Sequence, residues 1–471
     1  MSPERTPEER PIAALLAPDI LALLEESPAD VAAETEELHP ADLADVAEAL
    51  PVERIPAFLA ALPKERAADV LEYLDEELRV EVLEAMTPEQ AAILVEQMTP
   101  DDRADLLEEI DEEHAEDILE EIPDAARRET EQLLRFDPDT AGGLMTTEFV
   151  SVPADSTVED ALARVREIAR IGRREAMYAV YTTDGEGRIN GVLSLRELLA
   201  ALPGIPLTEV AWTEVVAVNP GADREEVARV IANYDLVAVP VVSESGHLMG
   251  VVTVDDVIDV IQEEQTEDIQ KLGGMEALDL PYATVGFWEM IKKRAGWLTA
   301  LFLGEMLTST AMKHFEGELA RALVLMLFVP LIISSGGNSG SQATSLIIRA
   351  LALRELTLRD WWKVAARELP SGVMLGSILG LVGMGRIILW QYLGWADYGT
   401  HWMLVATTVG TALVGVVTFG TLAGSMLPFL LKRLGLDPAS ASAPFVATLV
   451  DVTGLIIYFT AALVILRGTL L

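Results

Sequence analysis

The chain has 471 residues, no cysteine and a formal net charge of −42, yet 51% of its residues are hydrophobic. The charge is uneven: residues 1–275 hold 64 Asp and Glu against 20 Lys and Arg, whereas residues 276–471 hold 12 against 14. This composition excludes disulfides and thiolate metal sites. An acidic half of this strength also repels nucleic acid and suits a protein that handles cations.

The first part of the chain is acidic and repetitive. We expect a frayed start and one helix over residues 1–36, and the opening MSPERTPEERP lacks an apolar stretch of signal-peptide length. We therefore expect the acidic half to stay in the cytoplasm. An apolar residue followed by a cap or turn residue then recurs every 12 residues, at positions 50–51, 62–63, 74–75, 86–87, 98–99, 110–111 and 122–123. This period predicts a compact superhelix of short helices within a domain spanning residues 1–140. Most of its acids are interpreted as a solvated outer face.

A duplicated pattern of strands and helices follows. FVSVPADSTVEDAL (149–162) and GRINGVLSLREL (187–198) are matched by VVAVNPGADREEVA (215–228) and GHLMGVVTVDDV (246–257). Strand-like runs lie between the segments of each copy, at Met177–Tyr181 and Val237–Val242. The arrangement resembles a pair of CBS domains, with the first motif at 141–203 and the second at 204–262. Such pairs often bind adenine nucleotides, so the resemblance implies regulation.

An acidic helix is predicted to leave the second copy, within a linker and gating segment at 256–294. Five carboxylates at i, i+3, i+7, i+8 and i+11 fall on one helical face: Asp256, Asp259, Glu263, Glu264 and Glu267. Like charges stacked in this way destabilise a helix unless cations or an oppositely charged partner neutralise them. One interpretation is an exposed acidic face. We favour a divalent-cation site, because Mg²⁺ and Ca²⁺ require hard oxygen ligands.

Residues 295–471 predict a membrane domain. We expect five spans, at roughly 295–314, 322–348, 369–394, 402–430 and 439–466, preceded by an amphipathic segment at 281–297. Ten Lys and Arg residues lie on one side of these spans and four on the other. The positive-inside rule then places the N-terminal half in the cytoplasm and the C-terminus outside.

The stretch from Phe328 to Ala350 reads FVPLIISSGGNSGSQATSLIIRA. Gly336 and Gly340 form a GxxxG pair, which indicates a helix-packing face. We favour a second interpretation, the polar wall of a pore, because amide side chains are costly to bury in hydrocarbon without partners. Neither the glycines nor Asn338 carries a formal charge.

Few acidic residues lie within the expected spans. Glu305 lies in the first, and Asp451 lies near the middle of the last. A carboxylate at that depth costs about 2.5–3.5 kcal/mol on insertion scales, so it should face a wet cavity or a partner. A hydrogen-bonded packing aspartate is one interpretation, and a cation site on a permeation path is the one we favour. A single carboxylate can hold hydrated Mg²⁺ through the ion's waters.

This assembly resembles the MgtE family of magnesium channels over essentially the whole chain. The most specific motifs are PLIISSGGNSGSQATSLIIRALA (330–352) and PFVATLVDVTG (444–454). The resemblance implies a multidomain membrane protein with an all-α superhelical N-terminal domain, an α/β tandem CBS pair, a long linker helix and a five-span α-helical transmembrane domain. It also implies a homodimer in the plasma or inner membrane, with a pore on the dimer axis that is selective for Mg²⁺ and closed by cytosolic Mg²⁺.

The resemblance also assigns site residues. Asp451 would be the central ion-binding carboxylate, with the Ala447 carbonyl and the Asn338 side chain nearby. The regulatory metal sites would use Asp69, Asp101 and Asp105 in the N-terminal domain, and Glu225, Asp235, Asp256, Asp259, Glu264, Glu267 and Asp268 in the CBS pair and linker. Asp69 stands where the family pattern has Glu. Thr253 and Asp256 resemble the phosphate and ribose contacts of CBS domains, so Asp256 has two candidate uses and ATP or another adenine nucleotide would be a modulator.

The expected mechanism is feedback by differential ion binding to two states. At low Mg²⁺ the cytosolic acids repel one another and the pore opens, whereas bound Mg²⁺ draws their faces together and closes it. An ion-coupled secondary transporter using Asp451 for protons or Na⁺ is one alternative, and a Mg²⁺ sensor that does not transport is another. An enzyme is not expected, because the sequence contains neither a GxxxxGK[ST] loop nor an evident nucleophile–base pair.

Overall fold

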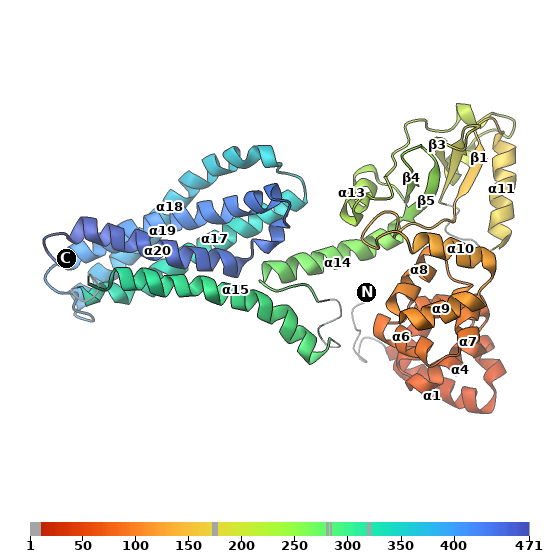
Figure 1. Cartoon of the computed structure of the whole chain (residues 1–471), viewed down its shortest axis with the longest axis horizontal. Coiled ribbons are helices and arrows are strands. Elements are labelled where there is room, and N and C mark those ends of the chain that lie inside the picture. Colours follow the sequence, from red (N-terminus) through yellow and green to blue (C-terminus); the bar gives the residue numbers. More distant parts are fainter. Residues whose placement is uncertain (1–10, 172–177, 279–281, 283–284, 318–321, 471) are drawn as a thin grey trace. The chain divides into compact units, whose positions relative to one another are not determined.

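The computed structural model of the chain describes residues 11–171, 178–278, 282, 285–317 and 322–470 (Figure 1). The chain divides into two compact units, Met1–Glu264 and Gln265–Leu471. The expected frayed start falls largely on residues 1–10, outside the described residues.

The first unit begins with a body of short helices, which Figure 1 shows gathered together. In chain order they are α1 (Pro11–Glu26), η1 (Pro28–Asp30), α2 (Val31–Glu34), α3 (Pro40–Glu48), η2 (Val52–Arg54), α4 (Ile55–Ala61), α5 (Lys64–Glu72), α6 (Glu76–Glu84), α7 (Pro88–Val95), α8 (Pro100–Glu109), α9 (Glu112–Glu121) and α10 (Asp124–Leu133). The 12-residue period is confirmed: the N-caps of α5 to α10 are Pro63, Asp75, Thr87, Thr99, Asp111 and Pro123.

Each repeat buries the apolar residue that precedes its cap. Leu62, Leu74, Met86, Met98, Ile110 and Ile122 all belong to one continuous core. Caps set the start of each helix, as at Thr87, which forms a capping box with Gln90. Helices of this length are unstable alone, so the shared core holds the superhelix together.

Two strand-containing layers follow in the same unit. In the first, β1 (Val150–Pro153) pairs parallel with β2 (Ala179–Thr183), which pairs antiparallel with β3 (Ile189–Ser194). Its helices are α11 (Val158–Ile171), α12 (Leu195–Ala200) and η4 (Leu207–Glu209). In the second, α13 (Arg224–Tyr234) precedes an antiparallel pair, β4 (Ala238–Val242) and β5 (Leu248–Thr253). A parallel bridge joins Val218 to Val241 and repeats the β1–β2 relationship. The predicted duplication is therefore present; Met177 of the first strand-like run lies outside the described residues.

The predicted acidic helix is α14 (Val254–Leu272), which begins directly after β5. It is continuous across the boundary between the two units. Val257 and Val260 are buried, whereas Ile258 is 51% exposed. The buried apolar stripe of α14 is therefore narrow.

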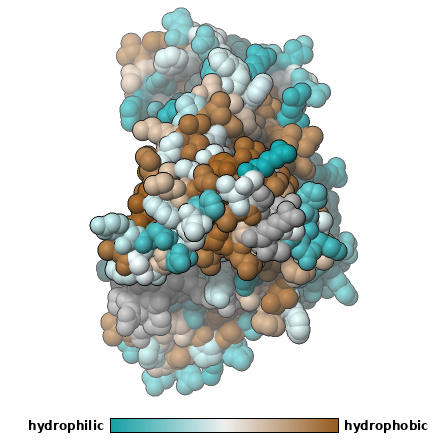
Figure 2. Space-filling view, turned by 90° about the vertical axis from the view of Figure 1, so that its left-hand side faces the viewer, coloured by the Kyte–Doolittle hydropathy of each residue, from teal (hydrophilic) through white to brown (hydrophobic). Residues whose placement is uncertain are grey.

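The second unit is a bundle of long helices that lie side by side in Figure 1. Its elements are α15 (Phe287–His314), η5 (Leu323–Phe328), α17 (Val329–Ala352), η6 (Leu358–Asp360), α18 (Trp361–Leu393), α19 (Trp402–Arg433), η7 (Pro438–Ser440) and α20 (Ala443–Leu466). The bundle carries many exposed apolar side chains, such as Leu381 and Val382 on α18. Figure 2, viewed from the side on which the C-terminus lies, shows hydrophobic residues over much of that face.

Among the described residues, four segments are long and apolar enough to cross a membrane: Leu323–Ala352, Leu358–Leu393, Trp402–Arg433 and Ala443–Leu466. The expected first span, in α15, is not one of these four. Glu305 and the hydroxyl-rich turns after it make the second half of α15 more polar than the other helices. Five spans therefore remain a prediction.

The glycine-rich stretch forms a regular helix, α17, that packs closely on α19 and α20. A Cβ on Gly336 would lie 2.6 Å from Val416 Cγ1, and one on Gly340 would lie 2.7 Å from Val446 Cγ1. Thr344 donates a hydrogen bond to the Gly424 carbonyl across the same contact, at 2.9 Å. The GxxxG pair thus serves helix packing. Asn338, in contrast, is exposed on the surface of the single chain.

Candidate ion sites

The predicted pore residues gather where α17 packs against α20. Asp451 is half-buried on α20, and Ala447 precedes it by four residues, on the same helical face. A Cβ on Gly337 would lie 3.5 Å from the Ala447 Cβ, so α17 passes α20 at this turn. Asn338 follows immediately and is exposed. The fold therefore places the carboxylate, the carbonyl and the amide on neighbouring turns of two helices.

A second carboxyl group belongs to this region. Glu305 of α15 lies within hydrogen-bonding reach of Asp451. The helices come close beside it, because a Cβ on Gly304 would lie 2.9 Å from Thr448 Cγ2. The sequence marks Glu305 as one of the few acids in the expected spans, but its pairing with Asp451 depends on how α15 packs. Two carboxylates this close repel each other unless a cation or a proton lies between them.

Several predicted regulatory acids meet in the first unit, between α5, α8 and the start of α14. The carboxylates of Asp69 and Asp101 both lie close enough to Glu72 to raise its pKa, and Asp101 has the same effect on Asp256. Glu72 and Asp102, which no sequence motif singles out, join this group. Burial, followed by the carboxylates of Asp102 and Asp69, raises the pKa of Glu72 to about 8.

Asp101 belongs to this group and is only 5% exposed. Burial, followed by the carboxylate of Asp102, raises its pKa to about 7. Its Oδ1 atom is buried and has no hydrogen-bond partner among the described residues. A buried carboxylate oxygen without a partner is costly, so this position favours a bound cation, a water molecule or a proton.

Asp256 is tied to the start of α14. Its Oδ2 accepts a hydrogen bond from the Thr253 hydroxyl at 2.7 Å, and Thr253 also bonds to Asp255. Burial, followed by the Asp101 carboxylate, raises the pKa of Asp256. Thr253 is buried, and its role with Asp256 as a nucleotide contact stays a prediction. Asp105, the remaining predicted acid of α8, has an exposed side chain.

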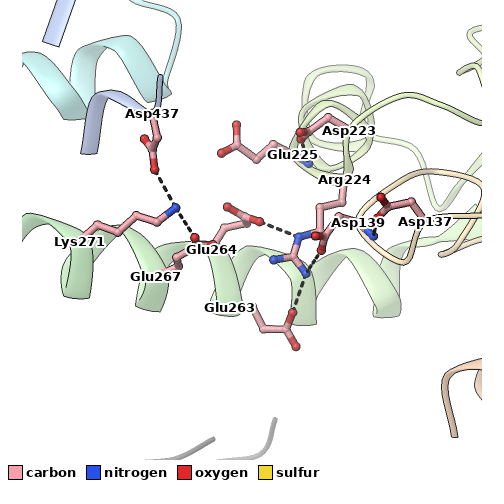
Figure 3. A network of polar contacts seen from close by, with 10 residues as sticks. All are labelled: Asp137, Asp139, Asp223, Arg224, Glu225, Glu263, Glu264, Glu267, Lys271 and Asp437. Carbon is pink, nitrogen blue, oxygen red and sulfur yellow. Dashed lines mark hydrogen bonds and ion pairs between the residues drawn. The ribbon is translucent and has the colours of Figure 1, made fainter. Parts of the chain in front are cut away.

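The acidic face of α14 has basic partners from elsewhere in the chain. Within the first unit, Arg224 of α13 forms ion pairs with Glu263 at 3.1 Å and Glu264 at 2.6 Å (Figure 3). Within the second unit, Lys271 pairs with Glu267 and, at 2.7 Å, with Asp437 before η7. Protein cations therefore neutralise part of the charge for which the sequence pattern predicts divalent ions.

The other predicted ligands are more dispersed. Glu225 and Asp235 are exposed at opposite ends of α13, where Asp235 caps the helix in a left-handed conformation with φ of 51°. Asp259 is exposed on α14, and Asp268 is half-buried. Among the described residues, no three or more His, Cys, Asp or Glu side chains converge tightly enough to hold a metal ion together. The acids suit a hydrated hard cation in their chemistry, and their assignment as ligands stays a prediction.

Comparison with known proteins identifies the class. A family model described as a divalent cation transporter, MgtE, matches residues 329–461. A model of the MgtE intracellular N domain matches 38–139, and CBS-domain models match 141–204 and 207–263. Membrane-length helices, an acidic helical domain and a CBS pair thus define a divalent-cation transporter with intracellular domains. The chain belongs to the MgtE family, which confirms the resemblance found in the sequence.

Relatives match across most of the chain. The magnesium transporter MgtE of Thermus thermophilus is 44% identical over 342 residues, 73% of each chain. That of Enterococcus faecalis is 35% identical over 340 residues, 72% of each. A crystal structure of the soluble part of a magnesium transporter is similar with a TM-score of 0.50 and 31% identity, covering 54% of this chain and 99% of that one.

Proposed function

We propose that this chain forms a homodimeric, Mg²⁺-selective channel that is closed by cytosolic Mg²⁺. Membership in a family of magnesium transporters supports the transported ion. The observation that carries the proposal is the position of Asp451, in the interior of the apolar helix α20 and one turn after Ala447. An intramembrane carboxylate is by default a residue of an ion pathway.

The dimer is supported by polar groups on the outer surface of the bundle. Asn338 and Gln342 of α17 are exposed in the single chain, although they lie in a helix of membrane-spanning length. Lipid contact would leave their amides without partners, so we infer that this face lines a wet pathway shared with a second copy. We infer a cytosolic first unit and an external C-terminus from the distribution of Lys and Arg around the five predicted spans.

Flux through the purified full-length protein in liposomes tests the transported ion. Wild-type protein should carry Mg²⁺ down its gradient, and Asp451→Asn should abolish that flux. Asp397→Asn, an exposed aspartate between α18 and α19, is the matched control and should leave flux unchanged. Flux that requires an imposed pH or Na⁺ gradient would favour a coupled transporter. Mg²⁺ binding without any flux would favour a sensor.

The gating half of the proposal is supported by the acids around Asp101. Divalent cations between α5, α8 and α14 would neutralise these carboxylates, whose charged forms are disfavoured by burial and by their mutual repulsion. We infer that bound Mg²⁺ holds the N-terminal helices against the CBS pair and fixes α14. An adenine nucleotide on the CBS pair remains a predicted modulator.

Neutralising Asp259, Glu264 and Glu267 together tests this gating. The triple variant, each acid changed to its amide, should conduct at cytosolic Mg²⁺ concentrations that close the wild type. The matched control changes Glu65, Glu112 and Glu186, exposed acids elsewhere in the first unit, to Gln. If Mg²⁺ inhibits the triple variant as strongly as the wild type, the acids of α14 do not mediate closure by Mg²⁺.

A further inference from the structure

Arg224 is placed like a cation at the centre of a small carboxylate site. Its Nε lies 2.6 Å from Glu264 Oε1, and its Nη1 lies 3.1 Å from both Glu263 Oε2 and Asp139 Oδ1. Figure 3 shows the guanidinium between these side chains, which come from α14 and from the segment that joins α10 to β1. All four residues belong to the first unit. One guanidinium therefore links the linker helix, the second CBS motif and the connection to the N-terminal helices.

Hydrogen bonds hold the backbone around Arg224 in place independently of its side chain. Arg224 is the first residue of α13, and Asp223 caps that helix by accepting a hydrogen bond from the Glu225 N–H at 2.8 Å. The Arg224 N–H also donates to the Asp139 carbonyl at 3.0 Å, and a bridge joins Thr140 to Asp223. The guanidinium consequently projects from a held position, and its three ion pairs need little further ordering.

Arg224 and Mg²⁺ compete for the negatively charged carboxylate of Glu264. Glu264 is a predicted ligand of the regulatory ion, and one of its oxygens already accepts a hydrogen bond from Arg224. A carboxylate has lone pairs for both, but a dication within a few ångströms of a guanidinium is repelled by it. Bound Mg²⁺ at Glu264 is therefore favoured when the guanidinium moves away.

We propose that Arg224 is a built-in competitor for regulatory Mg²⁺, occupying Glu263 and Glu264 when cytosolic Mg²⁺ is low and raising the Mg²⁺ concentration needed to close the channel. This rests on the Mg²⁺-gated function proposed above. Arg224 touches no transported ion: it acts through the acids of α14, as a positioning residue. By reciprocity, Mg²⁺ binding weakens the ion pairs of Arg224 by the same factor as Arg224 weakens Mg²⁺ binding.

The test compares Arg224→Gln with wild type in the full-length protein, by recording Mg²⁺ currents from liposome patches against Mg²⁺ on the cytosolic face. The half-inhibitory Mg²⁺ concentration should fall about fivefold or more, because couplings between two ligands are typically of that size. Arg224→Lys keeps the charge and should shift it less. Arg229→Gln is the control, since Arg229 lies on the same helix and bonds to the Glu225 carbonyl.

A second variant keeps the proposal testable if Arg224→Gln fails to fold. Glu264→Gln removes a Mg²⁺ ligand while Arg224 keeps Glu263 and Asp139, so the half-inhibitory concentration should rise. In a folded Arg224→Gln/Glu264→Gln protein, the loss of Arg224 should have a smaller effect than it has alone. An unshifted or raised value for Arg224→Gln would overturn the role of Arg224, as would an unshifted value for Glu264→Gln. Wild-type currents that ignore cytosolic Mg²⁺ would instead overturn the gating function itself.

Discussion

The carboxyl groups of Glu305 and Asp451 lie within hydrogen-bonding reach of each other where α15 packs against α20. The proposed pore therefore has two acids per chain near one level, contributed by different helices. Two charges hold a dication better than a monovalent ion, because the attraction scales with the charge of each partner.

Glu305→Gln should weaken the interaction of the pore with Mg²⁺ without abolishing permeation. We expect the Mg²⁺ concentration for half-maximal flux to rise about tenfold, because one of the two negative charges facing the ion is lost. The preference for Mg²⁺ over K⁺, measured from reversal potentials, should fall as well. Glu305→Asp should retain more of both, and Glu289→Gln in the first turn of α15 is the control. Wild-type values in Glu305→Gln would assign Glu305 to helix packing alone.

The acids between α5, α8 and α14 predict a pH-dependent contact when divalent cations are absent. Burial and nearby carboxylates raise the pKa of Glu72 to about 8 and that of Asp101 to about 7, above the 4.5 and 3.8 of free side chains. A raised carboxyl pKa stabilises the assembled state most at low pH, and that stabilisation is lost as pH rises through the raised values.

In EDTA, we therefore expect amide hydrogens of α5 and α8 to exchange more slowly at pH 5.5 than at pH 8.5, after correction for intrinsic rates. Mg²⁺ should restore protection at pH 8.5. Glu72→Gln, which cannot titrate, should flatten this dependence, whereas Glu65→Gln on the exposed side of the same helix should not. Greater protection at pH 8.5 in EDTA would contradict the assignment.

The packing of α17 on α19 predicts an asymmetric response to small substitutions. A Cβ on Gly424 would overlap the Gly340 carbonyl oxygen, whereas one on Gly385 of α18 would meet nothing within 4 Å. Gly424→Ala should therefore destabilise the protein by roughly 1–3 kcal/mol, the usual effect of overpacking. Gly385→Ala should be neutral. Thermal unfolding of the two variants in detergent measures this difference. Equal stability of the two variants would contradict the close approach of α17 and α19 at Gly424.

The ion pair between Lys271 and Asp437 is expected to stabilise the last turn of α14 against local unfolding within the second unit. Leu272 packs beside it against Ile348 and Ala439. Asp437→Asn should lower the free energy of local unfolding of this turn by about 1 kcal/mol, the upper end of the range for a partly exposed ion pair. Amide exchange in the last turn of α14 should then quicken about fivefold while Mg²⁺ flux persists. Exchange that stays at the wild-type rate would show that apolar packing alone holds the turn.

Patterns local in sequence predicted much of the fold. The 12-residue period placed the caps of α5 to α10, and Asp451 stood out because an acid in an apolar helix is costly. Partners distant in sequence could not be found in this way. Arg224 meets Glu264 only because α13 and α14 pack together, and Glu72 joins Asp101 only because α5 and α8 are neighbours in space. The GxxxG motif predicted a helix-packing face on α17, but it did not indicate which helix packs against that face.

The backbone contact between α17 and α19 also limits how the bundle can move. Gly420 and Gly424 lie against the carbonyls of Gly336 and Gly340, so no flexible side chain is available there to absorb a sliding motion. A shift along the helix axis would bring a residue with a Cβ against these carbonyls. We expect α17 and α19 to behave as one mechanical piece during gating. The change in pore width would then come from α20, which packs on both α17 and α19, and from α15, which packs on α20.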